Sequence, residues 1–123
     1  MAITLNTTLR NASSTAIVTE AGATAKLTVY TAAYAAVLYT STCAATLGTV
    51  AGGVLTFNAV GNATATGAGT AAIARLFKTD GTTMVIEGLT VGTSGTDIII
   101  TNTTIAVDDV VTTTSGTITE GNA

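Results

Sequence analysis

Short stretches of alternating apolar and polar residues, separated by Gly-rich turns, run along most of the chain and predict β-strands. In "KLTVYT", Leu27 and Val29 alternate with Lys26, Thr28 and Tyr30, which is the period of a half-buried strand. "YAAVLYT" leads into a second strand around residues 37–40. "ATLGTVAGGVLTFNAV" is typical of a hairpin that turns at two glycines. Its turn and its apolar positions are Gly52 and Gly53, with Leu47 and Val50 before them and Val54, Leu55 and Phe57 after them.

The second half of the chain continues this pattern. "GNATATGAGT" is a Gly/Thr loop or a weak strand, and a hairpin follows over residues 71–88. Further strands are predicted around 90–92 and 97–102, turned at Ser94-Gly95, and from Val110 onward. Many short strands at this spacing indicate an all-β fold, a sandwich or jelly-roll-like barrel of short antiparallel strands. Residues 1–123 form one β domain, because a second domain would lack a core of its own.

Residues 1–22, ahead of the first strand, are predicted to form a short N-terminal helix, with an extended arm as the alternative. Asn6 or Thr7 could cap this helix and Gly22 could stop it. The many Thr and Ser residues weaken the helix prediction. Loosely helical spacing supports it at Leu5, Leu9, Ala12, Ala16 and Ala23.

The hairpin "AAIARLFKTDGTTMVIEG" contains two of the four basic residues of the chain. A two-residue turn at Asp80-Gly81 would pair Arg75 with Ile86 and point the arginine onto an apolar face. A three-residue turn with the glycine as a bulge pairs Lys78 with Thr82 instead. Burial favours the second register, because a slip by one residue would drive a charge inward.

In the favoured register one face of the hairpin is wholly apolar, and it consists of Ala72, Ala74, Leu76, Met84 and Ile86. The other face is mixed, and it consists of Ile73, Arg75, Phe77, Thr83, Val85 and Glu87. Arg75 and Glu87 then lie diagonally across the strands, within reach of an ion pair. The mixed face suits an intersubunit contact with a salt bridge that sets its register. It equally suits a solvent face, where such a pair contributes only about 0–1 kcal/mol.

Composition points towards assembly with other chains. Charged residues make up 9% of the chain, against about 25% in a typical domain, and aromatic residues only 4%. The net charge is -3 and no basic patch is present, which excludes nucleic-acid binding through phosphates. No apolar stretch reaches the about 20 residues of a membrane span. We therefore expect the chain to cover surface with copies of itself; a monomer coated with threonine hydroxyls is the alternative.

Reactive chemistry is sparse in this sequence. It contains no His, which removes the commonest general base and metal ligand, so no enzyme and no cofactor are predicted. Cys43 is the single cysteine and is expected to be a small buried apolar residue. Asp97, Asp108 and Asp109 could offer oxygens to Ca²⁺, but adjacent aspartates fit a turn better, and no metal site is predicted.

Four segments together resemble a family of small β-rich proteins of tailed bacteriophages, encoded among virion structural genes. They are "TLRNA", "KLTVYT", "GVLTFNA" and, most clearly, "ARLFKTDGTTMVIEGLTVGTSGTDIIITNTTI" over residues 74–105. The resemblance covers most of the chain and consists of turn and strand patterns. The sequence departs from it after Thr31, where family members often carry a Pro and this chain has Ala32 and Ala33.

The resemblance implies a virion protein without catalytic residues, located on the capsid surface after synthesis in the host cytoplasm. The best-fitting role is a capsid decoration, or cement, protein that forms a trimer and clamps the major capsid protein. Leu5, Leu9 and Arg10 of the N-terminal segment could reach that shell. The alternative is a tail or fibre component that attaches to a host surface, with a sugar site near the clustered tyrosines Tyr30, Tyr34 and Tyr39.

Overall fold

The computed structural model describes residues 6–119, which form one helix, one 3₁₀ turn and twelve strands in that range. In chain order the elements are α1 (Thr7–Ala21), β1 (Lys26–Tyr30), η1 (Ala32–Tyr34), β2 (Val37–Thr42), β3 (Gly48–Ala51), β4 (Val54–Phe57), β5 (Ala63–Thr64), β6 (Gly69–Thr70), β7 (Ile73–Phe77), β8 (Met84–Gly92), β9 (Ile98–Ile100), β10 (Thr104–Ile105), β11 (Val110–Val111) and β12 (Thr113–Thr119).

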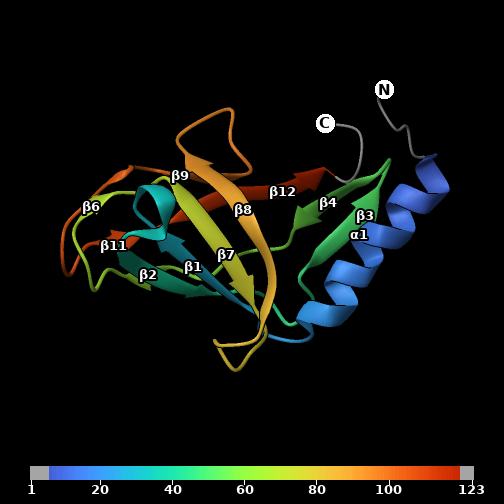
Figure 1. The fold of residues 1–123 in the computed structure, drawn as a ribbon, viewed down its shortest axis with the longest axis horizontal. Coiled ribbons are helices and arrows are strands. Elements are labelled where there is room, and N and C mark those ends of the chain that lie inside the picture. The colour runs from blue at the N-terminus through green and yellow to red at the C-terminus, as the bar shows by residue number, and fades with distance from the viewer. Residues whose placement is uncertain (1–5, 120–123) are drawn as a thin grey trace.

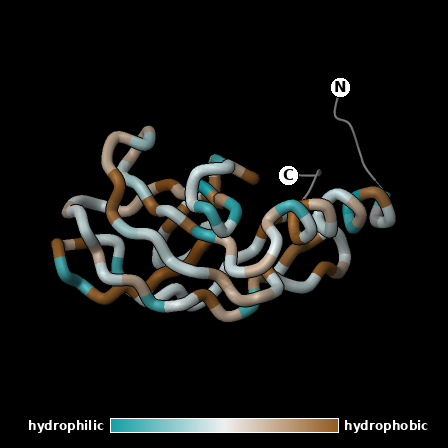
Figure 2. The backbone as a smooth tube through the Cα atoms, turned by 90° about the horizontal axis from the view of Figure 1, so that it is seen from below, coloured by the Kyte–Doolittle hydropathy of each residue, from teal (hydrophilic) through white to brown (hydrophobic). Residues whose placement is uncertain are grey.

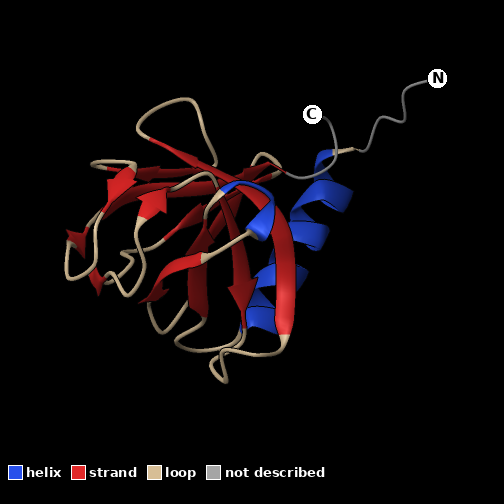
Figure 3. Cartoon of the chain, turned by 60° about the vertical axis from the view of Figure 1, so that its left-hand side comes forward, coloured by secondary structure: helices blue, strands red, loops and turns tan. Residues whose placement is uncertain are grey.

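Eight of these strands form a single sheet in the order β2-β1-β7-β8-β9-β12-β4-β3. The sheet curls into part of a barrel, with α1 at one end of the long axis (Figures 1 and 3). Two small two-stranded sheets, β10-β6 and β11-β5, lie at the opposite end (Figure 1). The all-β class is therefore confirmed. The two halves of one curled sheet face each other and form the two walls around the core.

Most strand predictions are confirmed, including the hairpin of β3 and β4. Its turn consists of Gly52 and Gly53, with φ of 58° and 78°. Positive φ at both central residues is the geometry that a two-residue hairpin requires and that glycine adopts without strain. "GNATATGAGT" contributes the two-residue strands β5 and β6, so its description as a weak strand is also correct.

The strands predicted on either side of Ser94-Gly95 are present, but β8 and β9 run parallel and do not form the antiparallel pair that a tight turn there implies. Val91 lies beside Ile98 in this pair, so the loop between the strands leaves the sheet and returns to the same end. Asp97 closes the loop: its Oδ2 accepts hydrogen bonds from the amide and the hydroxyl of Thr90, at 3.0 and 3.1 Å. The turn residues alone do not predict that the Asp97 carboxylate binds Thr90 of the neighbouring strand.

Of the two alternatives for the N-terminal segment, the helix is correct. Asn6 caps α1 by accepting a hydrogen bond from the amide of Leu9 at 2.8 Å, and Gly22 ends the helix with φ of 69°. The predicted apolar spacing was wrong, however, since it falls on the solvent side. Leu9 is 49% exposed, and the other described members of that spacing, Ala12, Ala16 and Ala23, are also exposed. The buried side of α1 consists of Ser14, Ile17, Val18 and Ala21.

The register of the β7–β8 hairpin differs from both predicted alternatives. Phe77 lies opposite Met84, as in the rejected two-residue turn, but the register then shifts at two bulges. The first bulge, at Val85, brings Arg75 directly opposite Glu87, and the second, at Gly88 with φ of 82°, places Ala74 opposite Leu89. Because the extra residue at Val85 reverses the faces of the residues that follow it, Arg75 pairs with Glu87 in place of Ile86 and its charge stays outside.

The inner face of the curled sheet forms the core. Leu27, Val29, Leu76 and Ala74 of the central strands are fully buried, and Leu55, Ile98, Ile100 and Ile118 face them from the other wall. Coloured by hydropathy, the backbone shows apolar and polar positions alternating along several strands (Figure 2). Each buried leucine or isoleucine contributes about 1.5–3 kcal/mol, so a few aliphatic side chains hold most of this core together.

Candidate functional site: the outer face around Arg75

The convex side of β2, β1, β7 and β8 carries an ion pair, two cation–π contacts and several side-chain hydrogen bonds, and we call it the outer face. Alternation along each strand separates it from the core. The register of the strands defines three rows of neighbours across it. They are Thr42, Lys26, Phe77 and Met84; Thr40, Thr28, Arg75 and Glu87; and Val37, Tyr30, Ile73 and Thr90.

Arg75 is the centre of the middle row. Its Nε donates to Oε2 of Glu87 at 3.1 Å, and the two side chains remain partly exposed. Burial works against the charge of Arg75, but its interactions with Tyr30 and Glu87 outweigh this effect and raise the pKa of the guanidinium. On the other side of Arg75, the hydroxyls of Thr28 and Thr40 are 3.2 Å apart. The row therefore holds two polar contacts side by side, Thr40 with Thr28 and Arg75 with Glu87.

Two tyrosines enclose the guanidinium of Arg75. Its Cζ lies 3.8 Å from the ring centroid of Tyr34 and 5.3 Å from that of Tyr30. The two rings meet edge to face, with centroids 5.2 Å apart. Tyr34 is fixed at its other end as well, because its hydroxyl accepts a hydrogen bond from the Gly88 amide at 2.8 Å. Cation–π attraction and this hydrogen bond hold Arg75 against the sheet.

The backbone beneath Tyr34 is strained. Ala33 and Tyr34 both have φ of 58°, in the left-handed region that costs L-residues roughly 1–2 kcal/mol each. This conformation belongs to η1, which leads from β1 to β2. The strain is tolerated because it brings the Tyr34 ring over Arg75, so the cluster and the loop geometry depend on each other.

The neighbouring row joins a cation to apolar side chains. Lys26 donates to the Thr42 hydroxyl at 2.9 Å, and no carboxylate of residues 6–119 lies within ion-pair distance of its ammonium group. Phe77 lies beside Lys26 and is half-buried, and Met84 beyond it is 48% exposed. The outer face thus presents an unmatched positive charge next to exposed apolar surface.

The structure brings four of the predicted interface residues together on the outer face: Ile73, Arg75, Phe77 and Glu87. Val85 was wrongly assigned to it. The register skips Val85 between Ile86 and Met84, and this bulged residue packs against the core. Leu5 lies outside the described residues.

Leu9 and Arg10 belong to a different region, on α1. Lys78 in the β7–β8 turn contacts the far end of that helix through Glu20, at 2.9 Å. Glu20 lies eleven positions after Leu9, which is roughly 16 Å along the helix. Arg10 packs over Gly53 of the β3–β4 turn, where an added methyl group would lie 2.6 Å from its Cζ. The predicted residues therefore form two separate groups.

Sequence reasoning grouped the tyrosines correctly only in part. Tyr30 and Tyr34 share the outer face, but Tyr39 points into the core and is fully buried. Burial raises the pKa of Tyr39 to about 12, against a smaller opposing effect of the Thr113 hydroxyl. The association of Tyr30 with Arg75 was missed, because it depends on the pairing of β1 with β7, more than forty positions apart.

Other reactive groups are not assembled into a site in residues 6–119. Burial raises the pKa of the Cys43 thiol to about 11, with a weaker opposing effect of Lys26, so the thiol is protonated and inert at neutral pH. In the described chain no three His, Cys, Asp or Glu side chains lie close enough to bind a metal ion.

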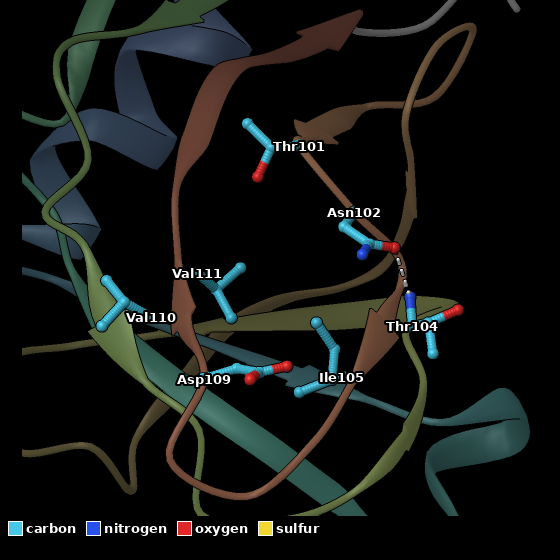
Figure 4. Close-up of a pocket in the computed structure, with 7 residues that line it drawn as sticks. All are labelled: Thr101, Asn102, Thr104, Ile105, Asp109, Val110 and Val111. Carbon is cyan, nitrogen blue, oxygen red and sulfur yellow. Dashed lines mark hydrogen bonds between the residues drawn. The ribbon is translucent and has the colours of Figure 1, made fainter.

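A pocket of about 130 Å³ opens between β10 and β11 (Figure 4). Its polar side chains bind their own loops: Asn102 accepts a hydrogen bond from the Thr104 amide at 3.0 Å, and Asp109 accepts one from the Ala106 amide at 2.9 Å. The pocket therefore presents loop surface and lacks convergent groups for a ligand.

The chain was compared with protein families, curated proteins and solved structures. No protein-family model, curated protein or solved structure matches the chain. Among the described residues, no helix has both the length and the apolar character needed to cross a membrane.

Proposed function

We propose that this chain is a non-enzymatic structural protein of a tailed-bacteriophage virion, a decoration protein that binds and stabilises the outer capsid shell as a homo-oligomer, with a trimer as the expected form. The observation that carries the proposal is the outer face. It is rigid, mixed in character and built from residue types that protein–protein interfaces favour. The resemblance of residues 74–105 to phage virion proteins supplies the biological setting.

The composition of the outer face supports a protein partner. Tyr, Met, Phe and Arg are enriched where proteins meet, and all four types occur here. Val37 and Met84 are 47% and 48% exposed, so the face offers apolar area at both of its edges. Arg75 is already held by Tyr34 and Glu87, so little side-chain freedom remains to be lost on binding.

The capsid contact is assigned to the exposed side of α1. Leu9 is 49% exposed near the start of the helix, whereas Arg10 is engaged with Gly53 of its own chain. Deleting everything before Thr15 would also remove Asn11, whose Oδ1 accepts a hydrogen bond from the Gly53 amide at 2.7 Å. A point substitution at Leu9 therefore tests capsid binding without undocking the helix.

The experiment has two steps. Particles of the phage that encodes the chain are purified and analysed by mass spectrometry and cryo-EM, and we expect the chain on the outer shell in stoichiometric amounts. Shells lacking it are then incubated with purified wild type, Leu9→Asp or the control Thr15→Asp, an exposed position on the same helix. Loss of binding is expected only for Leu9→Asp. Particles that contain none of the chain would refute the proposal.

The alternative role, a tail or fibre component that attaches to a host surface, is favoured by the pairing of Tyr30 with Tyr34. Arg75 covers one face of the Tyr34 ring, at 3.8 Å, and so competes with a stacked sugar. Glycan-array binding that disappears in Tyr34→Ala, together with a tail location by cryo-EM, would support this role in place of capsid decoration.

A further inference from the structure

The loop between β10 and β11, residues 106–109 together with Val110, forms a protruding tip with unusual chemistry. Val110 and Val107 are 65% and 55% exposed, the largest values among the large apolar side chains of the described residues. Asp108 lies between them, and within residues 6–119 its carboxylate has no hydrogen-bond or ion-pair partner. The tip therefore displays an unmatched anion flanked by two apolar side chains.

The tip is held in place before any partner arrives. The Asp108 amide donates to the carbonyl of Ala65 at 2.9 Å, and the Ala65 amide donates to the carbonyl of Asp109 at 2.7 Å. Asp109 also accepts a hydrogen bond from the Ala106 amide at 2.9 Å. Asp108 has φ of 74°, a conformation that aspartate tolerates better than most residues. A preformed protrusion of this kind binds with little ordering cost.

The outer face carries the matching surface. In the row of Lys26, Phe77 and Met84, an ammonium group without a carboxylate partner in the described chain lies beside one half-buried and one exposed apolar side chain. One cation and two apolar side chains are the groups that complement the anion and the two valines of the tip. No ion pair joins Lys26 and Asp108 within the described part of one molecule.

We propose that the tip of one copy docks onto the Lys26–Phe77–Met84 row of a second copy, with Asp108 pairing with Lys26. Two different patches then meet in a head-to-tail contact, and for a trimer the rotation between neighbouring copies must close into a ring. The occupant is a second copy because both halves of the contact are present in one chain, each with its charge unmatched. This inference rests on the homo-oligomer of the proposed function and specifies the surface that builds it.

Zero-length carbodiimide coupling tests the contact in the native protein, since it joins a carboxylate to an amine only when they touch. A mixture of unlabelled and ¹⁵N-labelled protein is coupled, digested and analysed by mass spectrometry. We expect an amide between Asp108 and Lys26, with about half of the linked peptides carrying one labelled and one unlabelled half. Glu20 and Lys78, at 2.9 Å within one chain, supply the internal control and should give no mixed product.

Absence of the mixed Asp108–Lys26 product, while the Glu20–Lys78 product forms, would overturn the inference. Sedimentation equilibrium gives a second, independent measurement. Asp108→Asn and the double variant Val107→Ser/Val110→Ser should each weaken self-association at least about tenfold, which is about 1.4 kcal/mol. Ala16→Ser changes an exposed apolar side chain on α1, outside both patches, and should leave association unchanged.

The two proposals fail separately. A wild-type oligomer that is unaffected by the tip variants refutes the tip contact and leaves capsid decoration standing. An oligomer that depends on the tip but is missing from purified virions refutes capsid decoration and leaves the tip contact standing. A wild-type protein that stays monomeric at all concentrations refutes the tip contact directly.

Discussion

Arg10 on α1 and Arg75 on β7 are both half-buried, but they are held in different ways. Arg75 is enclosed by side chains: two tyrosine rings and the Glu87 carboxylate. Arg10 instead packs over the backbone of Gly53, in space that exists because glycine lacks a side chain. In a chain with so few charges, both guanidiniums serve as packing groups. The Arg75 contacts depend on long-range strand pairing, and the contact of Arg10 with Gly53 depends on the conformation of one turn.

The largest effect is expected where Arg10 meets the turn. Gly53→Ala should destabilise the protein by roughly 2 kcal/mol, because alanine is strained at φ of 78° and its methyl group displaces Arg10. Gly52→Ala is the matched control. It carries the backbone cost at φ of 58°, but its methyl group would meet no atom within 4 Å. Urea unfolding should give about half the loss for Gly52→Ala.

Hydrogen exchange distinguishes the two glycine variants further. We expect faster exchange of the α1 amides in Gly53→Ala and unchanged exchange in Gly52→Ala, since only the former removes the Arg10 contact. Equal exchange in both variants would show that Arg10 does not hold the helix, and the contrast between the two arginines would then be lost.

On the other side of the comparison, Tyr34→Ala should cost about 1–2 kcal/mol. It removes the ring over Arg75 and the hydrogen bond from the Gly88 amide. Tyr34→Phe keeps the ring and loses only the hydrogen bond, so it should cost about 0.5–1.5 kcal/mol, less than the alanine variant. Unfolding in urea measures both. If phenylalanine costs as much as alanine, cation–π packing contributes nothing and the hydrogen bond alone holds Tyr34.

The contrast also explains what could be predicted from the sequence. Local signals were sufficient for β1, for the Gly52-Gly53 turn and for the Asn6 and Gly22 helix ends, because each depends on neighbours within a few residues. The Arg75–Glu87 pair was also found, although by a register that proved wrong. Two bulges in β8 changed the pairing in ways that alternation alone cannot reveal.

The remaining misses share a physical cause. The buried side of α1 is lined by Ser14 and Ala21, so hydrophobic spacing selected the exposed side instead. The parallel β8–β9 pair depends on Asp97 binding Thr90, and the tyrosine cluster depends on β1 pairing with β7. In each case the local sequence fits several pairings equally well, and contacts between distant parts of the chain select one. A chain rich in Thr, Ala and Gly has many such cases.

A smaller effect tests the strain under Tyr34. Ala33→Gly should stabilise the protein by about 0.5 kcal/mol, because glycine accepts φ of 58° without the cost that alanine bears. Part of this gain is offset by the greater freedom of glycine in the unfolded chain. Urea unfolding would detect the change if denaturation is two-state. A loss of 1 kcal/mol or more would mean that Ala33 is not strained and that the position of Tyr34 needs another explanation.

The smallest effect concerns the turn that joins the two regions, since Lys78 contacts α1 and Arg75 lies three residues earlier. Hydrogen bonds lower the pKa of Asp80 from 3.8 to about 2. The Thr83 hydroxyl has the largest effect, followed by the amides of Thr83 and Thr82. The folded pKa lies below the unfolded one, so the turn's stabilisation is complete above about pH 4 and disappears as the pH falls through 2.

Carboxyl-carbon NMR should measure this titration directly. Thr83→Val should raise the pKa of Asp80 clearly, and Thr82→Val, which keeps its backbone amide, should raise it only slightly. Equal shifts in both variants would mean that the amides, and not the Thr83 hydroxyl, hold the carboxylate in its ionised form.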